Sequence, residues 1–276
     1  MNRRELLAAG VASVTGLALA DTGKAPETKT NSLRAQRLSW AGIKLQSPAT
    51  TILLDPWVSP ASLGSAWKEP IVPITVETDP RFVLVTHLHN DHFDPAAIKP
   101  VVKESGFAVV ALEGKASAVA SRGFRVYPAK MYEPVVLGDF TAVAVPASDG
   151  FNEQQVSWVV TNNSKRIIHC GDTLWHGGFW HLGRQFGPFD AAFVPINGAK
   201  LKGWQPFSDI EATMTPKQAV AASLLLNAKL AVPIHHGLND PENYLEHPNA
   251  VAEFKETAAA RKVPYKVMEP GEWLEL

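Results

Sequence analysis

Short apolar runs alternate with polar segments along most of the chain, and this pattern predicts a protein built from both strands and helices. Two runs near the start, 37–46 and 50–55, are typical of the two strands of a hairpin. Further runs rich in Val, Ile, Ala and Phe predict buried strands at 81–86, 107–112, 140–145, 155–160, 166–170, 191–195 and 230–234.

Two segments carry the signals that begin a helix. Asp94 as N-cap with Pro95 behind it predicts a helix over 95–104, and Thr215, Pro216 and Gln218 form a capping box that predicts a helix over 216–227. Strands that alternate with helices favour an α/β fold with a mixed sheet and helices outside it, because both faces of the sheet need covering.

The first twenty residues predict an export signal. Arg3 and Arg4 precede an uncharged run that ends on the small-x-small triplet 18–20, so we expect cleavage after Ala20 and a periplasmic protein. The paired arginines resemble a twin-arginine signal, with an ordinary secretory signal as the alternative. The run is interrupted and shorter than the ~20 apolar residues of a membrane span, so no permanent membrane anchor is expected.

Residues 21–35 are polar without periodicity and predict a linker, which leaves 36–276 as one domain long enough for a substantial core. The chain has 26 Lys and Arg against 27 Asp and Glu, without blocks of like charge. Nucleic acid is therefore not an expected partner, because phosphate binding shows as a basic excess or stripe. Cys170 is the single cysteine, so no disulfide can form within the chain. The sequence leaves the oligomeric state open.

One segment, "VTHLHNDHFD" at 85–94, holds an unusual density of metal-ligand side chains directly after a predicted strand. His87 and His89 point the same way in an extended chain, and a turn beyond them brings Asp91 and His92 back from another direction. Four such side chains exceed what one tetrahedral catalytic ion needs, since that ion keeps one position open. The segment therefore predicts two metal ions.

Three later strand ends carry further ligand types. Asp149 follows the run 140–145, Asp172 follows 166–170, and His235 and His236 follow 230–234. A sheet delivers the residues at its strand ends to one rim, where α/β folds usually place their sites. A carboxylate at such a place can bridge two cations with its two oxygens.

The order HxHxDH, GDT and PIHxG resembles the metallo-β-lactamase superfamily, and the resemblance covers nearly all of 36–276. Within it, "ILLDPWVSP", "MTPKQAVAASLLLNAKLAVPIHHG" and "EPGEWLEL" are similar to the branch of ascorbate-6-phosphate lactonase and N-acylphosphatidylethanolamine phospholipase D. The resemblance implies a four-layer αββα sandwich with a dinuclear metal site. It also implies the ligands: His87 and His89 for the first ion, Asp91, His92 and His235 for the second, and Asp172 between them.

Asp149 stands where relatives place a third histidine for the first ion. An Asp-Gly pair is also a common turn, which is the alternative interpretation. Because a carboxylate oxygen can bind the same cation as an imidazole, we predict that Asp149 replaces the histidine. The expected cofactors are two divalent ions, zinc first, with manganese or iron better tolerated because the first position becomes harder.

Two cations that share a water lower its pKa and make hydroxide available as a nucleophile, which predicts a metal-dependent hydrolase. Asp91 is expected to serve as ligand and as proton acceptor. The site does not choose between ester, lactone and phosphodiester, so the expected substrate is a small or lipid-like molecule. The alternative from another class is a catalytically silent metal-binding or interaction protein on the same fold.

Five more residues are candidates for contact with the substrate. His176 lies four residues beyond Asp172 and is either a proton donor or substrate contact or an ordinary loop histidine. Trp175, Trp180 and Trp204 lie in loops predicted near the same rim and form either a pocket wall or core. His236, next to His235, is either a pocket residue or a structural one.

Overall fold

The computed structural model of the protein describes residues 33–60, 66–102, 109–163, 165–238 and 240–276. The predicted export signal and residues 21–32 of the predicted linker lie outside the described residues. Strand β1 already begins at Arg34, so the last residues of the segment predicted as linker belong to the folded domain.

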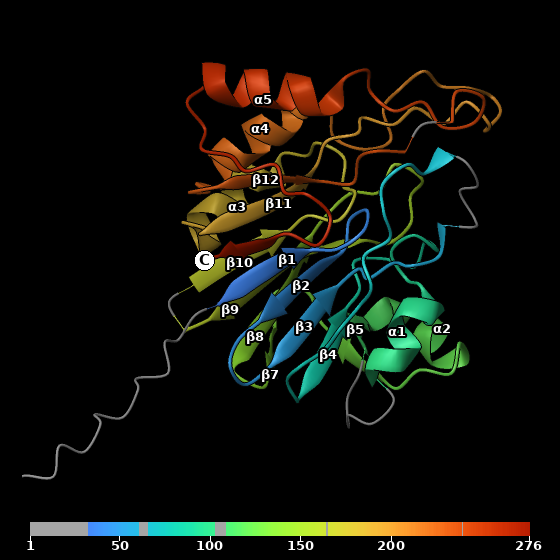
Figure 1. The fold of residues 1–276 in the computed structure, drawn as a ribbon. Helices are drawn as coiled ribbons and strands as arrows, with labels where there is room; N and C mark the ends of the chain where they lie inside the picture. Colours follow the sequence, from blue (N-terminus) through green and yellow to red (C-terminus); the bar gives the residue numbers. More distant parts are fainter. Residues whose placement is uncertain (1–32, 61–65, 103–108, 164, 239) are drawn as a thin grey trace, which may run out of the picture. The chain divides into compact units, whose positions relative to one another are not determined.

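The first sheet has seven strands in the order β13-β1-β2-β3-β4-β5-β6 (Figure 1). Its strands β3 to β6 run parallel, and β13, β1, β2 and β3 pair antiparallel. Their bounds are β1 Arg34–Arg37, β2 Ile43–Gln46, β3 Thr51–Leu54, β4 Arg81–Leu84, β5 Val109–Leu112, β6 Val126–Ala129 and β13 Trp273–Glu275.

The second sheet has six strands in the order β12-β11-β10-β9-β8-β7. Strands β10, β11 and β12 are parallel, while β7, β8, β9 and β10 alternate in direction, so β8 runs the same way as β10. Their bounds are β7 Pro134–Leu137, β8 Phe140–Pro146, β9 Val156–Asn162, β10 Lys165–His169, β11 Ala191–Pro195 and β12 Ala231–Ile234.

Helices cover the outer face of each sheet. An apolar cluster containing Val83, Ile98 and Val119 joins the first sheet to α1 (Pro95–Val102) and α2 (Ala116–Ser121), and the short η2 (Glu113–Lys115) leads into α2. A second cluster joins the other sheet to α3 (Gly178–Phe186), α4 (Pro216–Leu225) and α5 (Ala250–Ala260). Figure 1 shows these two helix groups on opposite sides of the sheets. This arrangement confirms the predicted four-layer αββα sandwich.

A third apolar cluster fills the space between the two sheets. It includes the fully buried rings of Trp40, Phe140, Trp158 and Phe193. Because each sheet has the core on one face and helices on the other, strands such as β12 read as continuous apolar runs without alternation.

Both predicted helix starts are confirmed. Helix α1 begins at Pro95, and Asp94 Oδ1 accepts the backbone N–H of Ala96 at 2.9 Å. Helix α4 begins at Pro216 inside the full capping box, with Gln218 N donating to Thr215 Oγ1 and Thr215 N donating to Gln218 Oε1. Helices α2, α3 and α5 were not predicted.

The predicted strand 37–46 contains a turn, and the hairpin interpretation is corrected there. The chain leaves β1 at Arg37, turns with Trp40 at φ 58° and enters β2 at Ile43, while Gly42 N donates to Ser39 O at 2.9 Å. The predicted partner strand, 50–55, pairs with β2 as β3. The turn carries Trp40 to the rim where the strand-end ligands lie.

Among the described residues, no helix combines the length and apolar character that a membrane crossing requires.

Candidate metal centre

Four strand ends meet at one rim and bring seven His and Asp side chains together. His87, His89, Asp91 and His92 follow β4, Asp149 follows β8, Asp172 follows β10 and His235 follows β12. These strands point their carboxyl ends the same way within each sheet, so residues far apart in the sequence reach one place.

The seven side chains form two groups of metal-ligand atoms. The first group is His87, His89, Asp149 and Asp172, and the second is Asp91, His92 and His235. Within each group the ligand atoms lie within 4.8 Å of one another. The first group includes Asp149 and Asp172, and the second consists of the three residues that the family resemblance implies for the second ion.

Asp172 connects the two groups through a single oxygen. Its Oδ2 lies 3.7 Å from His87 Nε2 of the first group, and 3.8 Å and 4.0 Å from the Nε2 atoms of His92 and His235 of the second. Its other oxygen, Oδ1, accepts a hydrogen bond from Gln155 Nε2 at 2.7 Å. One carboxylate therefore faces both groups at once.

The second group contains buried nitrogen atoms that no atom of the described residues satisfies. His92 Nε2 and His235 Nε2 have no hydrogen-bond partner among the described residues. Both face Asp91 Oδ2, at 3.6 Å and 3.8 Å. Buried polar atoms are normally paired. Unpaired imidazole nitrogens opposite a carboxylate are what a site for a divalent cation requires, so the donor set fits the expected metal.

Asp55, which was not among the predicted site residues, orients the histidines from the side opposite the metal-ligand atoms. This buried carboxylate, at the end of β3, accepts His92 Nδ1–H at 2.8 Å and the Thr86 hydroxyl at 2.6 Å. Thr86 Oγ1 in turn lies 3.0 Å from His87 Nδ1. Because the Nδ1 atoms of His87 and His92 face this network, their Nε2 atoms are the ones that face the carboxylate of Asp172.

Gly171 allows Gln155 to reach Asp172. Its backbone has φ 64°, and a Cβ there would lie 2.6 Å from Gln155 Nε2 and 3.1 Å from Thr86 Oγ1. A side chain at this position would be strained in its backbone and would displace the amide that holds Asp172.

Burial and the close approach of opposite charges set the protonation of the site. Burial alone would raise the pKa of Asp91, but the imidazoles of His92 and His235 hold that pKa well below its usual range. For His87, burial is the main cause that lowers the pKa to about 4, despite the nearby Asp172. At neutral pH Asp91 is thus a carboxylate and His87 a neutral imidazole, which are the forms that bind a cation.

Asp149 uses its two oxygens differently. Oδ2 accepts the backbone N–H groups of Phe151 at 2.6 Å and Glu153 at 2.8 Å, which fixes the turn expected from an Asp-Gly pair. Oδ1 lies 3.9 Å from His89 Nδ1, within the first group. The turn and the ligand interpretations are therefore compatible, since each takes one oxygen.

A cavity of about 470 Å³ opens onto the two groups. His89, Asp91, Asp172 and His235 form its polar side. The rest of its wall is mainly apolar and aromatic, with Phe151, Leu201, Trp204, Leu238 and Tyr244 among the lining residues. The Trp204 and Phe151 rings pack at 4.6 Å between centroids. Of the candidate substrate residues, Trp204 alone lines this cavity.

The segment after Asp172 turns away from the cavity. His176, Trp175 and Trp180 are not among its lining residues. Helix α3 begins at Gly178 and buries Phe179, so Trp180 beside it faces outward with 59% of its surface exposed. His176 stacks on Phe179 at 4.1 Å, and its Nδ1 accepts Gly178 N–H.

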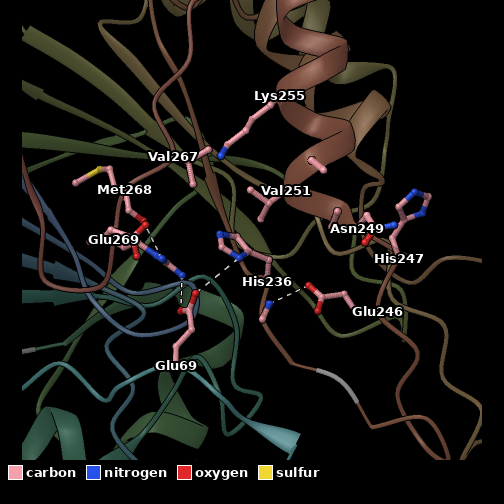
Figure 2. A pocket seen from close by; sticks show the side chains of 14 residues that line it. Glu69, His236, Glu246, His247, Asn249, Val251, Lys255, Val267, Met268 and Glu269 are labelled. Atoms are coloured by element: carbon pink, nitrogen blue, oxygen red, sulfur yellow. Dashed lines mark hydrogen bonds and ion pairs between the residues drawn. The ribbon is translucent and has the colours of Figure 1, made fainter.

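His236 lines a second hollow instead. Its ring lines a cavity of about 610 Å³ beside α5, where its Nδ1 lies 4.0 Å from Glu69 Oε1 (Figure 2). Glu69 is paired there with the buried Arg37 at 2.6 Å. The adjacent His235 has φ 55°, a left-handed conformation that directs the two neighbouring side chains to different sides.

Comparison with known proteins finds metal-dependent hydrolases that are similar to this chain in sequence or in fold. Residues 50–236 match the model of the beta-lactamase superfamily domain. A UPF0173 metal-dependent hydrolase from Thermococcus kodakarensis is 31% identical over 82% of this chain and 92% of its own length, and one from Pyrococcus abyssi is 29% identical over the same shares. The metallo hydrolase Igni18 from Ignicoccus hospitalis shares the fold, with a TM-score of 0.68 and 21% identity over 89% of this chain and 98% of that one.

Proposed function

The chain belongs to the beta-lactamase superfamily domain family as a metal-dependent hydrolase, and we propose that its two groups hold two divalent cations that serve the hydrolysis of an ester, lactone or phosphodiester bond. One observation carries this proposal. Asp172 Oδ2 faces imidazole nitrogens of both groups within 4.0 Å, as a carboxylate shared by two cations would. Zinc is the proposed metal, with manganese or iron accepted at the position that contains Asp149.

The cations would supply water of lowered pKa and would neutralise the charge that develops on the substrate. The protein's own contribution begins with Asp91, which is held as a carboxylate and lines the cavity. Trp40 Nε1 donates to its Oδ2 at 3.0 Å, which fixes the side chain in place. We assign Asp91 as a ligand and as the acceptor of the proton that the attacking water loses.

The apolar part of the cavity supports a substrate with a ring or an alkyl portion. Phe151, Leu201, Trp204 and Leu238 offer a surface against which such a group can pack. A small lactone or aryl ester and a lipid-like phosphodiester both meet this description, as the resemblance to the lactonase and phospholipase D branch suggests.

The test is a substrate screen against a metal-stripped control. Generic aryl phosphodiesters, aryl esters and lactones are offered to the protein loaded with Zn²⁺, Mn²⁺ or Fe²⁺. We expect turnover of at least one class that disappears on chelation and returns when metal is added. Tight metal binding without turnover of any class would instead favour the silent metal-binding protein.

Trp204 provides a prediction about the cavity wall, with Trp180 as its matched control. Trp204→Ala removes an indole that packs on Phe151 in the cavity, so KM is expected to rise about fivefold to tenfold with kcat nearly unchanged, since the lost contact is worth about 1 kcal/mol. Trp180→Ala removes an equally large ring that is exposed to a similar extent but does not line the cavity, and it should leave both constants within about twofold of the parent. Steady-state kinetics on the best substrate of the screen measures both. If the two substitutions had equal effects, the proposal that Trp204 contacts the substrate would be wrong.

A further inference from the structure

A series of side-chain hydrogen bonds runs from Thr213 through Asn197 to Tyr244 in the cavity wall. The side chain of Tyr244 lines the same cavity as Asp91, Asp172 and His235, and its hydroxyl oxygen accepts a hydrogen bond from Asn197 Nδ2. Asn197 is fully buried and follows β11, so it is held by the sheet. The loop around Tyr244 is fixed as well, because its N–H donates to Asp240 O at 2.8 Å and its carbonyl accepts from Asp240 N.

The direction of the hydrogen bonds in this chain follows from burial. Ala199 N donates to Thr213 Oγ1 at 3.2 Å, and Thr213 then donates its own proton to Asn197 Oδ1. If the Asn197 amide were turned round, the proton of the nearly buried Thr213 hydroxyl would have no acceptor, which is costly. In the observed order neither Asn197 nor Thr213 accepts the Tyr244 proton, and the Tyr244 side chain lines the cavity.

Among the described residues, the Tyr244 hydroxyl has no assigned acceptor for this proton. Its oxygen accepts the Asn197 amide, so the O–H proton is available to an acceptor other than Asn197. Burial is the main cause that raises the pKa of Tyr244 well above its usual value, and the Asp91 and Asp172 carboxylates raise it further. The hydroxyl thus stays protonated at neutral pH and keeps a proton to donate in the cavity that it lines together with Asp91 and Asp172.

We propose that Tyr244 donates a hydrogen bond to the substrate oxygen on which negative charge develops during hydrolysis, and that Asn197 and Thr213 are positioning residues for this donor. The inference rests on the proposed function and extends it to a residue outside the two metal-ligand groups. No proton needs to leave Tyr244 in this role. A fixed donor aimed at a developing oxyanion contributes most in the transition state.

Turnover is measured for Tyr244→Phe, Asn197→Asp and the double variant on the best substrate of the screen. Tyr244→Phe removes only the donor, so kcat/KM is expected to fall about 100-fold with the metal content unchanged. Asn197→Asp replaces the amide donor by a carboxylate that accepts the Tyr244 proton, so the donor turns away and a similar loss is expected. The double variant should be no worse than either single variant, because both act on one hydrogen bond. If the two losses were additive, Asn197 would have a merely structural role, and the proposal that it positions the Tyr244 hydroxyl would be overturned.

A second measurement does not require hydrolysis. Inorganic phosphate is titrated calorimetrically into the zinc-loaded parent and into Tyr244→Phe, a variant that keeps the ring and its packing. We expect the affinity for phosphate to fall about tenfold or more, as for the loss of a hydrogen bond to a charged group. Phosphate affinity within twofold of the parent would overturn the proposal. A parent that binds phosphate but hydrolyses nothing would refute the proposed function, while the phosphate comparison would still decide whether Tyr244 is a donor to the bound oxyanion.

Discussion

Replacement of Asp172 by alanine is expected to lower kcat/KM by at least about a thousandfold, which corresponds to ~4 kcal/mol of transition-state stabilisation. The reason is geometric. Within the described part of the chain, Asp172 Oδ2 is the one oxygen that faces imidazole nitrogens of both metal-ligand groups, so its removal weakens both positions together. Metal analysis of the purified variant should show loss from both positions.

Asp190→Ala is the matched control for this substitution. Asp190 is also an aspartate near a strand end, but it pairs with Lys229 and Lys165 and takes no part in either metal-ligand group. Its removal should leave metal content and turnover near those of the parent and cost only stability. If Asp172→Ala kept both metals and more than a tenth of the parent activity, the shared carboxylate would be refuted.

Replacement of Asp149 by alanine is expected to reduce the bound metal from two ions per chain to nearer one. Its Oδ1 belongs to the group of His87 and His89, and without it that group keeps only two imidazoles and the shared Asp172. Asp149→His should restore two ions and favour zinc, since an imidazole is a softer ligand than a carboxylate. Elemental analysis after equilibration with mixed Zn²⁺ and Mn²⁺ measures both effects.

Asp149→Asn distinguishes the role of Asp149 as a metal ligand from its role in fixing the turn. An asparagine can keep one oxygen as acceptor for the Phe151 and Glu153 N–H groups, but its amide nitrogen is not a ligand for a cation. We expect this variant to unfold near the temperature of the parent and still to bind nearer one ion. If both Asp149→Asn and Asp149→Ala still bound two ions tightly, Asp149 would not be a metal ligand and would serve only to fix the turn.

The ligand side chains could be selected from the sequence because each directly follows an apolar strand. His87, Asp149, Asp172 and His235 all lie at such ends, and parallel strands bring their carboxyl ends to one rim. Asp55, a carboxylate at the end of the apolar run 50–55, carries the same signal but was not predicted as a site residue. The fold followed from the same pattern together with the family resemblance.

The residues that were misplaced or missed depend on local backbone geometry that no periodicity reveals. Trp40 reaches Asp91 because a turn with positive φ interrupts a segment that reads as one strand. The start of α3 at Gly178 carries Trp180 outward, although the sequence places it close to Asp172. Tyr244 lies in a loop without a pattern, and its place is fixed by hydrogen bonds to Asp240 and Asn197.

The central claim is that two cations share Asp172, one in each metal-ligand group. Anomalous diffraction from crystals of the zinc-loaded protein, recorded above and below the zinc edge, tests it most directly. The account predicts two peaks per chain, one among His87, His89 and Asp149 and one among Asp91, His92 and His235, with Asp172 between them. A single peak, with the other group empty at saturating zinc, would contradict it.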